Sequence, residues 1–107
     1  CMGVPWGAPD DLNTFMAMVN NVPDTWTFSA FALGRNQMAY VAASVLAGGH
    51  VRVGLEDNLW LEKGVLATNE ALVARAVGII EGLGATVMGL DQVRQKLNLI
   101  KQLPRAS

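Results

Sequence analysis

The chain has 107 residues, of which 51% are hydrophobic, so it is long enough for one small domain and too apolar to be intrinsically disordered. Its net charge is −1, from 8 basic and 9 acidic residues, so no basic surface for binding nucleic acid is expected. The longest apolar run, residues 38–47, is about half of the roughly 20 residues that a membrane-spanning helix needs, and we expect no membrane contact.

The first residues are typical of the end of a β-strand whose beginning is missing. Cys1 is not an initiator methionine, and residues 1–4 run into a loop at residues 3–10 that is rich in Gly and Pro. We therefore expect the chain to be a piece of a larger domain. Cys1 is also the single cysteine, which excludes a disulfide framework and favours a reducing, cytoplasmic setting.

A helix is predicted to begin near Leu12, where Asp10 or Asp11 can accept hydrogen bonds from its first turn. Pro23 ends this helix, because proline disfavours helical backbone in the residue before it. Apolar residues at helical spacing define one face of the helix: Leu12, Phe15, Met16 and Val19.

A buried strand and a second helix follow. Residues 26–33 are rich in aromatic and other β-favouring residues, which predicts a buried strand. Residues 34–37 are predicted to form a turn, and residues 38–47 a helix that ends at Gly48 and Gly49.

Residues 50–56 are predicted to form the strand around which the fold is organised. Helical patterns on both sides of it suggest that both faces are covered. An arginine and a carboxylate on a covered face are unfavourable unless they are paired, bind a metal or act in function. Two sets alternate along the strand, an apolar set of Val51, Val53 and Leu55 and a second set of Arg52, Gly54 and Glu56.

The last part of the chain is predicted to hold two more helices. A polar loop at residues 57–64 precedes a helix capped by Thr68 or Asn69. A short β-like piece is expected at residues 85–88, and an irregular terminus at residues 101–107. The apolar face of the first helix is predicted to contain Leu72, Val73, Ala76, Val77 and Ile80. The second helix is predicted to begin at Leu90 or Asp91, with Val93, Leu97 and Ile100 facing inward.

This alternation of strands and helices predicts an α/β fold with βα units, a parallel sheet and right-handed crossovers. Two strands and the end of a third cannot close a sheet with both faces covered, so further strands are needed. In such folds, sites are built at the carboxyl ends of the strands.

Glu56 ends the 50–56 strand and is a candidate metal ligand or acid–base residue, or simply the partner of Arg52. Arg52 lies about 13 Å away along a straight strand, and its long side chain can reach part of that distance toward a substrate or a carboxylate. Asp57 lies past the strand and faces another way, so it could take a different role from Glu56 or cap the following turn.

His50, the single histidine, lies about 20 Å from Glu56 along the strand, so the two cannot share a metal ion and His50 is expected to be structural. Arg35, after the 26–33 strand, is a weaker candidate for binding an anionic substrate. Trp6 and Gly7, after the first strand end, are candidate substrate-binding residues of the same kind.

The segment GHVRVGLEDN at residues 49–58 resembles the β-keto acid cleavage enzymes, the family of 3-keto-5-aminohexanoate cleavage enzyme. The RVGLED run within it is the most specific part of the resemblance, which extends over essentially the whole chain. Three further segments fall in the family's order: GVPWG at 3–7, FALGRNQ at 31–37 and KGVLATN at 63–69.

The resemblance implies the C-terminal portion of a (β/α)8 TIM barrel nearly three times as long as this chain. Residues 1–107 would supply the end of strand six, strands seven and eight, and the closing helices. The missing N-terminal part of the barrel would then be a necessary partner, and we expect the isolated chain to be inactive.

The resemblance also implies a divalent metal, usually Zn²⁺, held by Glu56 and by two histidines of an earlier strand that would precede Cys1. The family condenses a β-keto acid with acetyl-CoA and cleaves the adduct to acetoacetate and a new CoA thioester. By position, Arg52 and Asp57 would assist proton transfer and substrate activation.

The alternative is a small α/β binding or assembly module. In such a module Arg52 and Glu56 form a structural pair, and exposed apolar strand edges drive self-association. We expect a homo-oligomer.

Overall fold

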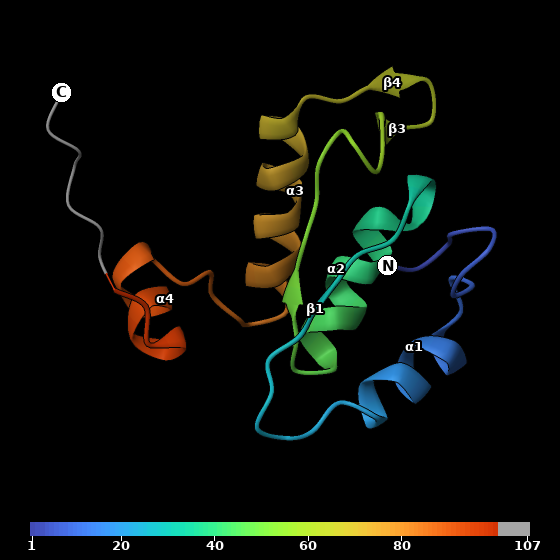
Figure 1. Cartoon of the computed structure of the whole chain (residues 1–107). Helices are drawn as coiled ribbons and strands as arrows, with labels where there is room; N and C mark the ends of the chain where they lie inside the picture. The colour runs from blue at the N-terminus through green and yellow to red at the C-terminus, as the bar shows by residue number, and fades with distance from the viewer. Residues whose placement is uncertain (101–107) are drawn as a thin grey trace, which may run out of the picture.

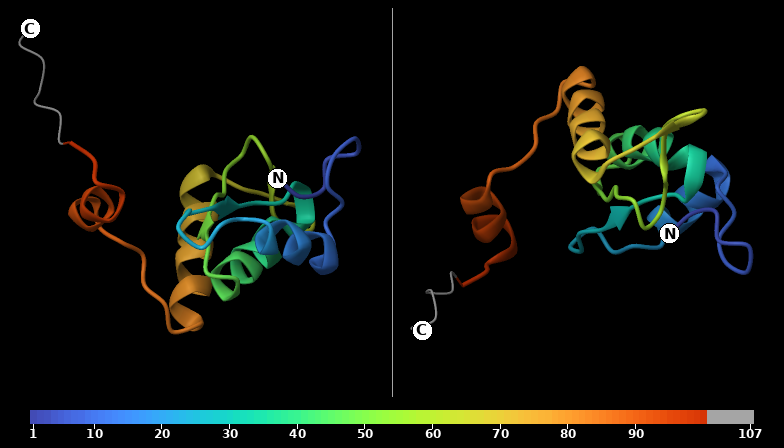
Figure 2. Two further views of the ribbon diagram at one scale, coloured as in Figure 1. Left: turned by 60° about the horizontal axis from the view of Figure 1, so that its bottom comes forward. Right: turned by 90° about the horizontal axis from the view of Figure 1, so that it is seen from above.

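The computed structural model describes residues 1–100. In Figure 1, α1, α2 and α3 lie close to β1, whereas α4 stands apart at the end of the described chain, and the two views of Figure 2 agree. The helices are α1 (Leu12–Asn20), the single 3-10 turn η1 (Gly34–Asn36), α2 (Gln37–Leu46), α3 (Asn69–Gly82) and α4 (Leu90–Leu97). The strands are β1 (Ser29–Ala30), β2 (His50–Val51), β3 (Trp60–Glu62) and β4 (Val65–Leu66).

The predicted parallel arrangement is confirmed. β1 pairs in parallel with β2, with Ser29 opposite His50. Met2 forms an isolated parallel bridge to Ala32, two residues past β1 and on the edge opposite to β2. The first residues of the chain, β1 and β2 are therefore neighbours in the order in which they occur in the sequence, as βα units require.

Both long strands are shorter than predicted. The ladder between residues 26–33 and 50–56 ends where the Arg52 amide donates to the carbonyl of Ala30 at 3.3 Å. The chain then leaves the sheet, because the Gly54 carbonyl accepts from the Asp57 amide at 3.2 Å and closes a turn. Residues 50–56 are thus a two-residue strand followed by an irregular segment and a turn.

The start of α1 is capped as predicted, by Asp11, whose Oδ1 accepts from the amide of Thr14 at 2.8 Å. Of the apolar face predicted for this helix, Phe15 is buried, whereas Leu12 and Met16 are exposed. Phe15 meets the Tyr40 ring edge to face, with ring centroids 5.5 Å apart. This pair belongs to the first core cluster, which also contains Met2, Ala30 and Ala32.

The helix α2 lies between two core clusters. Its Tyr40 belongs to the first, and its Val41 to the second, together with Ala76 and Ile80 of α3. Burial raises the pKa of the Tyr40 hydroxyl, and the charges of Asp10 and Asp11 raise it further.

The ends of α2 and α3 follow the predicted signals. Gly48, just past α2, has φ of 85°, a left-handed conformation that favours glycine. Thr68 caps α3, since its hydroxyl accepts from the amide of Ala71 at 3.1 Å. Of the face predicted for α3, Val73 is exposed and Val77 is half-buried, while three residues are buried: Leu72, Ala76 and Ile80.

The polar loop predicted at residues 57–64 is wrong in part, because β3 and β4 form an antiparallel hairpin. Gly64 takes φ of 82° in its tight connection. Buried Asn58 fixes the entry to the hairpin, as its Nδ2 donates to the carbonyl of Trp60 and its Oδ1 accepts from the Trp60 amide. Arg75 of α3 donates to the carbonyl of Leu61 at 2.7 Å and holds the hairpin against the helix.

The β-like piece predicted at residues 85–88 is a connection without regular secondary structure. α4 begins at Leu90 as predicted, and Val93 is half-buried. The inward face predicted for α4 and the residues after it is wrong for Leu97, which is 46% exposed, and for Ile100, which is 92% exposed. The irregular terminus predicted at residues 101–107 lies outside the described residues. None of the helices within residues 1–100 is long and apolar enough to cross a membrane.

Candidate active site

Arg52 joins the two acidic residues that follow β2. Its Nε lies 3.2 Å from Asp57 Oδ2, and its Nη2 lies 3.3 Å from Glu56 Oε2. The guanidinium stands over the ring of Phe31, with Cζ 4.6 Å from the ring centroid, in a cation–π arrangement. We refer to Phe31, Arg52, Glu56 and Asp57 as the Arg52 cluster.

The two carboxylates of the Arg52 cluster have different environments. The side chain of Glu56 is 85% exposed, that of Asp57 is 7% exposed, and that of Arg52 is 49% exposed. Both acids contact the same guanidinium, but Glu56 is open to a ligand whereas Asp57 is enclosed by protein. Such a difference suits the two carboxylates to different roles.

The turn after β2 corrects the predicted geometry of this site. Arg52 and Glu56 were expected to lie about 13 Å apart along a straight strand. Residues 55–57 instead form a turn, which brings the two side chains into contact. Glu56 therefore lies on a turn rather than on the polar face of a strand.

Side chains from two helices hold this turn, and no role was predicted for them. Gln37 Nε2 donates to the carbonyl of Gly54 at 3.1 Å. Asn69 Oδ1 accepts from the amide of Leu55 at 2.9 Å. Both residues occur in segments that resemble the family, FALGRNQ and KGVLATN, and that is the signal that could have pointed to them.

The carboxyl ends of the three neighbouring strand segments meet near the Arg52 cluster. The amide of Gly34, the first residue of η1, donates to the carbonyl of Asp57 at 2.8 Å. Asn36 of η1 donates from Nδ2 to Asp10 Oδ2, which ties η1 to the loop after Met2. The sheet therefore presents the loop at residues 3–10, η1 and the acidic turn (residues 54–58) on one side, as parallel strands require.

The weaker candidates lie on these same connections. Arg35 is exposed on η1, and Trp6 (89% exposed) and Gly7 are exposed on the loop at residues 3–10. Within residues 1–100, no hydrogen bond or ion pair joins Arg35, Trp6 or Gly7 to the Arg52 cluster. Their role in substrate binding stays a prediction.

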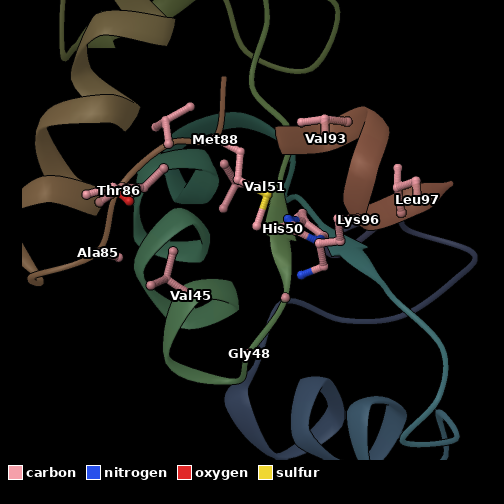
Figure 3. A pocket seen from close by; sticks show the side chains of 13 residues that line it. Val45, Gly48, His50, Val51, Ala85, Thr86, Met88, Val93, Lys96 and Leu97 are labelled. Carbon is pink, nitrogen blue, oxygen red and sulfur yellow. The ribbon is translucent and has the colours of Figure 1, made fainter. Parts of the chain in front are cut away.

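His50 lies at the start of β2, at the far end of that segment from the acidic turn. It lines a cavity of about 480 Å³ with Lys96, Val45 and Met88. Figure 3 shows these side chains gathered between α2, β2 and α4. The structural role expected for His50 stays a prediction.

A family model described as beta-keto acid cleavage enzyme matches residues 1–99, nearly the whole chain. The chain belongs to this family. The resemblance seen in the RVGLED run, which contributes three members of the Arg52 cluster, is thereby confirmed.

Several curated members of the family are similar to this chain. A "3-dehydrocarnitine:acetyl-CoA trimethylamine transferase" of Rhizobium meliloti (strain 1021) is 69% identical over 102 residues, which cover 95% of this chain and 34% of the relative. A "3-keto-5-aminohexanoate cleavage enzyme" of Acetoanaerobium sticklandii is 36% identical over 94% of this chain and 37% of its own length. A "3-oxoadipate:acetyl-CoA acetyltransferase" of Cupriavidus necator is 36% identical over 92% of this chain and 36% of its own length. The chain thus spans about a third of the length of these curated relatives.

The metal expected for this family can be tested against the described residues. Within residues 1–100, no three His, Cys, Asp or Glu side chains gather closely enough to hold a metal ion. Glu56 alone fits as one ligand, because its exposed carboxylate is the donor type that Zn²⁺ and other divalent cations accept. Any such ion would take its other ligands from outside the described residues.

Proposed function

We propose that this chain is the C-terminal part of a β-keto acid cleavage enzyme that converts a β-keto acid and acetyl-CoA to acetoacetate and a new CoA thioester. One observation carries the proposal: a half-exposed arginine holds one exposed and one enclosed carboxylate at the carboxyl end of β2. It is supported by membership of the family and by the acetyl-CoA-dependent names of two relatives.

The proposed setting is a (β/α)8 barrel. The parallel order of the first residues, β1 and β2 is what the last three neighbouring strands of such a barrel would have. The remaining strands and the rest of the substrate pocket would come from the N-terminal part of the enzyme. The site lies at the carboxyl ends of the strands, where barrel enzymes carry their active sites.

The proposed chemistry begins with removal of a proton from the carbon between the ketone and the carboxylate of the β-keto acid. That carbanion attacks the thioester carbonyl of acetyl-CoA and releases the CoA thiolate. The thiolate then adds to the original ketone carbon, and the adjacent carbon–carbon bond breaks to leave acetoacetate, which regains the proton, and the new thioester.

The three charged residues of the Arg52 cluster have separate parts in this proposal. Asp57, enclosed and beside Arg52, accepts the proton as general base. The planar guanidinium of Arg52 binds the carboxylate of the β-keto acid. Glu56 supplies one ligand to a divalent metal, which would stabilise developing enolate charge when bound.

The proposed substrate is 3-dehydrocarnitine or a β-keto acid with a similar cationic group. The support is the 69% identity to the relative named for 3-dehydrocarnitine, against 36% to the relative named for 3-keto-5-aminohexanoate. The test uses the complete enzyme that contains residues 1–107, with acetyl-CoA and each of these two acids. Acetoacetate formation that is faster with 3-dehydrocarnitine supports the proposal, and no acetoacetate from any β-keto acid overturns it.

The contact between Arg52 and Glu56 is the observation that favours the alternative, a small binding or assembly module with a structural ion pair. However, the two side chains are 49% and 85% exposed. Ion pairs this exposed contribute about 0–1 kcal/mol to folding. A purely structural role would therefore give little stability, and a Glu56→Gln variant that melts like the parent protein but loses activity would favour the enzyme.

A further inference from the structure

We propose that Gln37 and Asn69 are positioning residues, which fix the acidic turn and thereby set where the carboxylates of Glu56 and Asp57 lie. This inference rests on the proposed function. Both side chains contact the backbone of the turn: Gln37 bonds to Gly54, and Asn69 bonds to Leu55.

The turn itself has weak means of holding its shape. Its internal backbone bonds converge on one acceptor, the carbonyl of Gly54, which accepts from the amides of Asp57 and Asn58 at 3.2 Å each. Gly54 also has no side chain to pack against its neighbours and is the most conformationally free residue type. Bonds from outside the turn are therefore needed to select one conformation. One comes from the backbone, where the Gly34 amide donates to the Asp57 carbonyl at 2.8 Å, and two come from side chains.

Gln37 supplies one of these bonds from the start of α2. Its side chain is completely buried, and its Nε2 donates to the Gly54 carbonyl at 3.1 Å. Its Oε1 is buried and has no hydrogen-bond partner within residues 1–100. An apolar side chain would avoid this unfavourable burial, so the contribution of Gln37 at this position is its bond to the turn.

Asn69 supplies the second side-chain bond, from the first residue of α3. Its Oδ1 accepts from the Leu55 amide at 2.9 Å, directly before Glu56. Asn69 does not cap the helix, because that role belongs to Thr68, which accepts from the Ala71 amide. The two neighbouring residues therefore have different roles. Thr68 stabilises the start of α3, and Asn69 stabilises the acidic turn.

For the rate of the reaction, the position of the acidic turn is more important than its contribution to folding stability. Shifts of about 1 Å in catalytic groups can lower rates by about 10²-fold, and loss of a residue that orients a metal ligand typically lowers metal affinity or activity by roughly 10–100-fold. Losing the Asn69 bond should therefore lower kcat clearly, while the melting temperature of the enzyme changes little. The KM for acetyl-CoA should stay the same, because Asn69 contacts the turn rather than the thioester.

The experiment compares three variants in the complete enzyme: Asn69→Ala, Asn69→Asp and Thr68→Ala. Alanine removes the acceptor and is a good helix former, whereas aspartate keeps an acceptor oxygen at the same place. Thr68→Ala is the matched control, since it weakens the same helix end without touching Leu55. The measurements are kcat, KM, metal affinity, and hydrogen exchange of a peptide covering residues 53–58.

The expected result is a roughly 10–100-fold lower kcat or metal affinity in Asn69→Ala, with faster exchange in the turn. Asn69→Asp should restore most of the activity and the protection, and Thr68→Ala should keep both. Gln37→Met, which removes the donor at similar volume, should behave like Asn69→Ala.

Three outcomes overturn the inference. Equal losses in Thr68→Ala and Asn69→Ala would mean that fraying of α3 is the cause. Faster exchange in Asn69→Ala with unchanged kcat and metal affinity would mean that the turn need not be held, while the proposed function stands. A parent enzyme that is inactive, although its turn is protected from hydrogen exchange, would overturn the proposed function. The turn would then have no role in that reaction.

Discussion

Asp57 Oδ2 lies 3.2 Å from Arg52 Nε, yet the Asp57 side chain is 7% exposed and its neighbour Glu56 is 85% exposed. The two adjacent carboxylates contact the same guanidinium but therefore differ in their access to solvent. Glu56 can be reached from solution, whereas Asp57 can act where water is largely excluded. This difference leads to separate predictions for the two residues in the complete enzyme.

Glu56→Gln should weaken metal binding markedly, because a neutral amide oxygen is a poorer donor to a divalent cation than a carboxylate. Asp57→Asn should keep the metal and lower the single-turnover rate by roughly 10²–10⁴-fold, as expected for loss of a general base. Elemental analysis beside single-turnover kinetics separates the two. Equal metal loss in both variants would indicate that they share one role as ligands, and full metal with full rate in both would contradict the assignment.

Arg52→Lys should lose most turnover while the metal content and the melting temperature stay close to those of the parent enzyme. Lysine keeps the charge but lacks the planar fork that contacts both carboxylates. The pair with the exposed Glu56 should add about 0–1 kcal/mol to stability, and lysine keeps a positive charge beside the enclosed carboxylate of Asp57. Thermal denaturation and turnover measured together test this, and a variant that does not fold would point to a structural ion pair instead.

Gly49→Ala should destabilise the protein by roughly 1–3 kcal/mol, the usual effect of overfilling a packed site. A Cβ atom at Gly49 would overlap the ring of Phe28, which lies beside the start of β2. Gly78→Ala in α3 is the matched control, because a Cβ there meets nothing within 4 Å. It should be neutral or stabilise by up to about 1 kcal/mol. Equal melting temperatures for the two variants would contradict the predicted overlap.

The cap of α1 should weaken in acid. Hydrogen bonds from the Thr14 amide and then the Thr14 hydroxyl lower the pKa of Asp11 below its usual value of 3.8. A lowered pKa means that the folded state binds the proton less tightly than the unfolded state does. The stabilisation is therefore present above about pH 4 and is lost as the pH falls through the pKa of the folded state.

The amide chemical shift of Thr14, followed by NMR while the pH is lowered, measures this effect. Asp11→Asn is the control, since asparagine is an equally good N-cap but does not titrate. Its Thr14 amide shift should stay flat over the same range. A matching pH-dependent shift in that variant would assign the change to another group.

Residues 1–107 alone should self-associate. Many large apolar side chains are exposed, including four on the hairpin: Leu59, Trp60, Val65 and Leu66. Exposed apolar patches and unpaired strand edges favour association. Size-exclusion chromatography with light scattering should give a mass above the 11.4 kDa of one chain. A monodisperse monomer with a cooperative thermal transition would contradict this expectation.

The sequence was most informative where local signals decide the structure. The caps at Asp11 and Thr68, the glycines after α2 and the helical spacing in α3 were all predicted from nearby residues. The hairpin was missed because its strands are only two and three residues long. Lys63-Gly64 between short apolar runs was the signal that could have revealed it.

The geometry of the Arg52 cluster could not be predicted from periodicity. The alternation in residues 50–56 favours a long strand, and Gly54 within it permits a bend without specifying its direction. The bend depends on Gln37, Gly34 and Asn69, which lie elsewhere in the chain. The site residues were therefore proposed from their types and from the family resemblance, and a pair of Arg52 with Glu56 was one of the alternatives, whereas the contact of Arg52 with Asp57 required the structure.

The acidic turn has a consequence for the order of folding. The bonds that shape it join residues 14 to 23 positions apart in the chain, namely Leu55 with Asn69, Gly54 with Gln37 and Asp57 with Gly34. Contacts of this kind form after loop closure has brought their elements together, whereas helix turns form locally and earlier. The acidic turn should thus reach its native shape only after the local turns of α2 and α3 have formed, so the site depends on a longer-range step than these helices do.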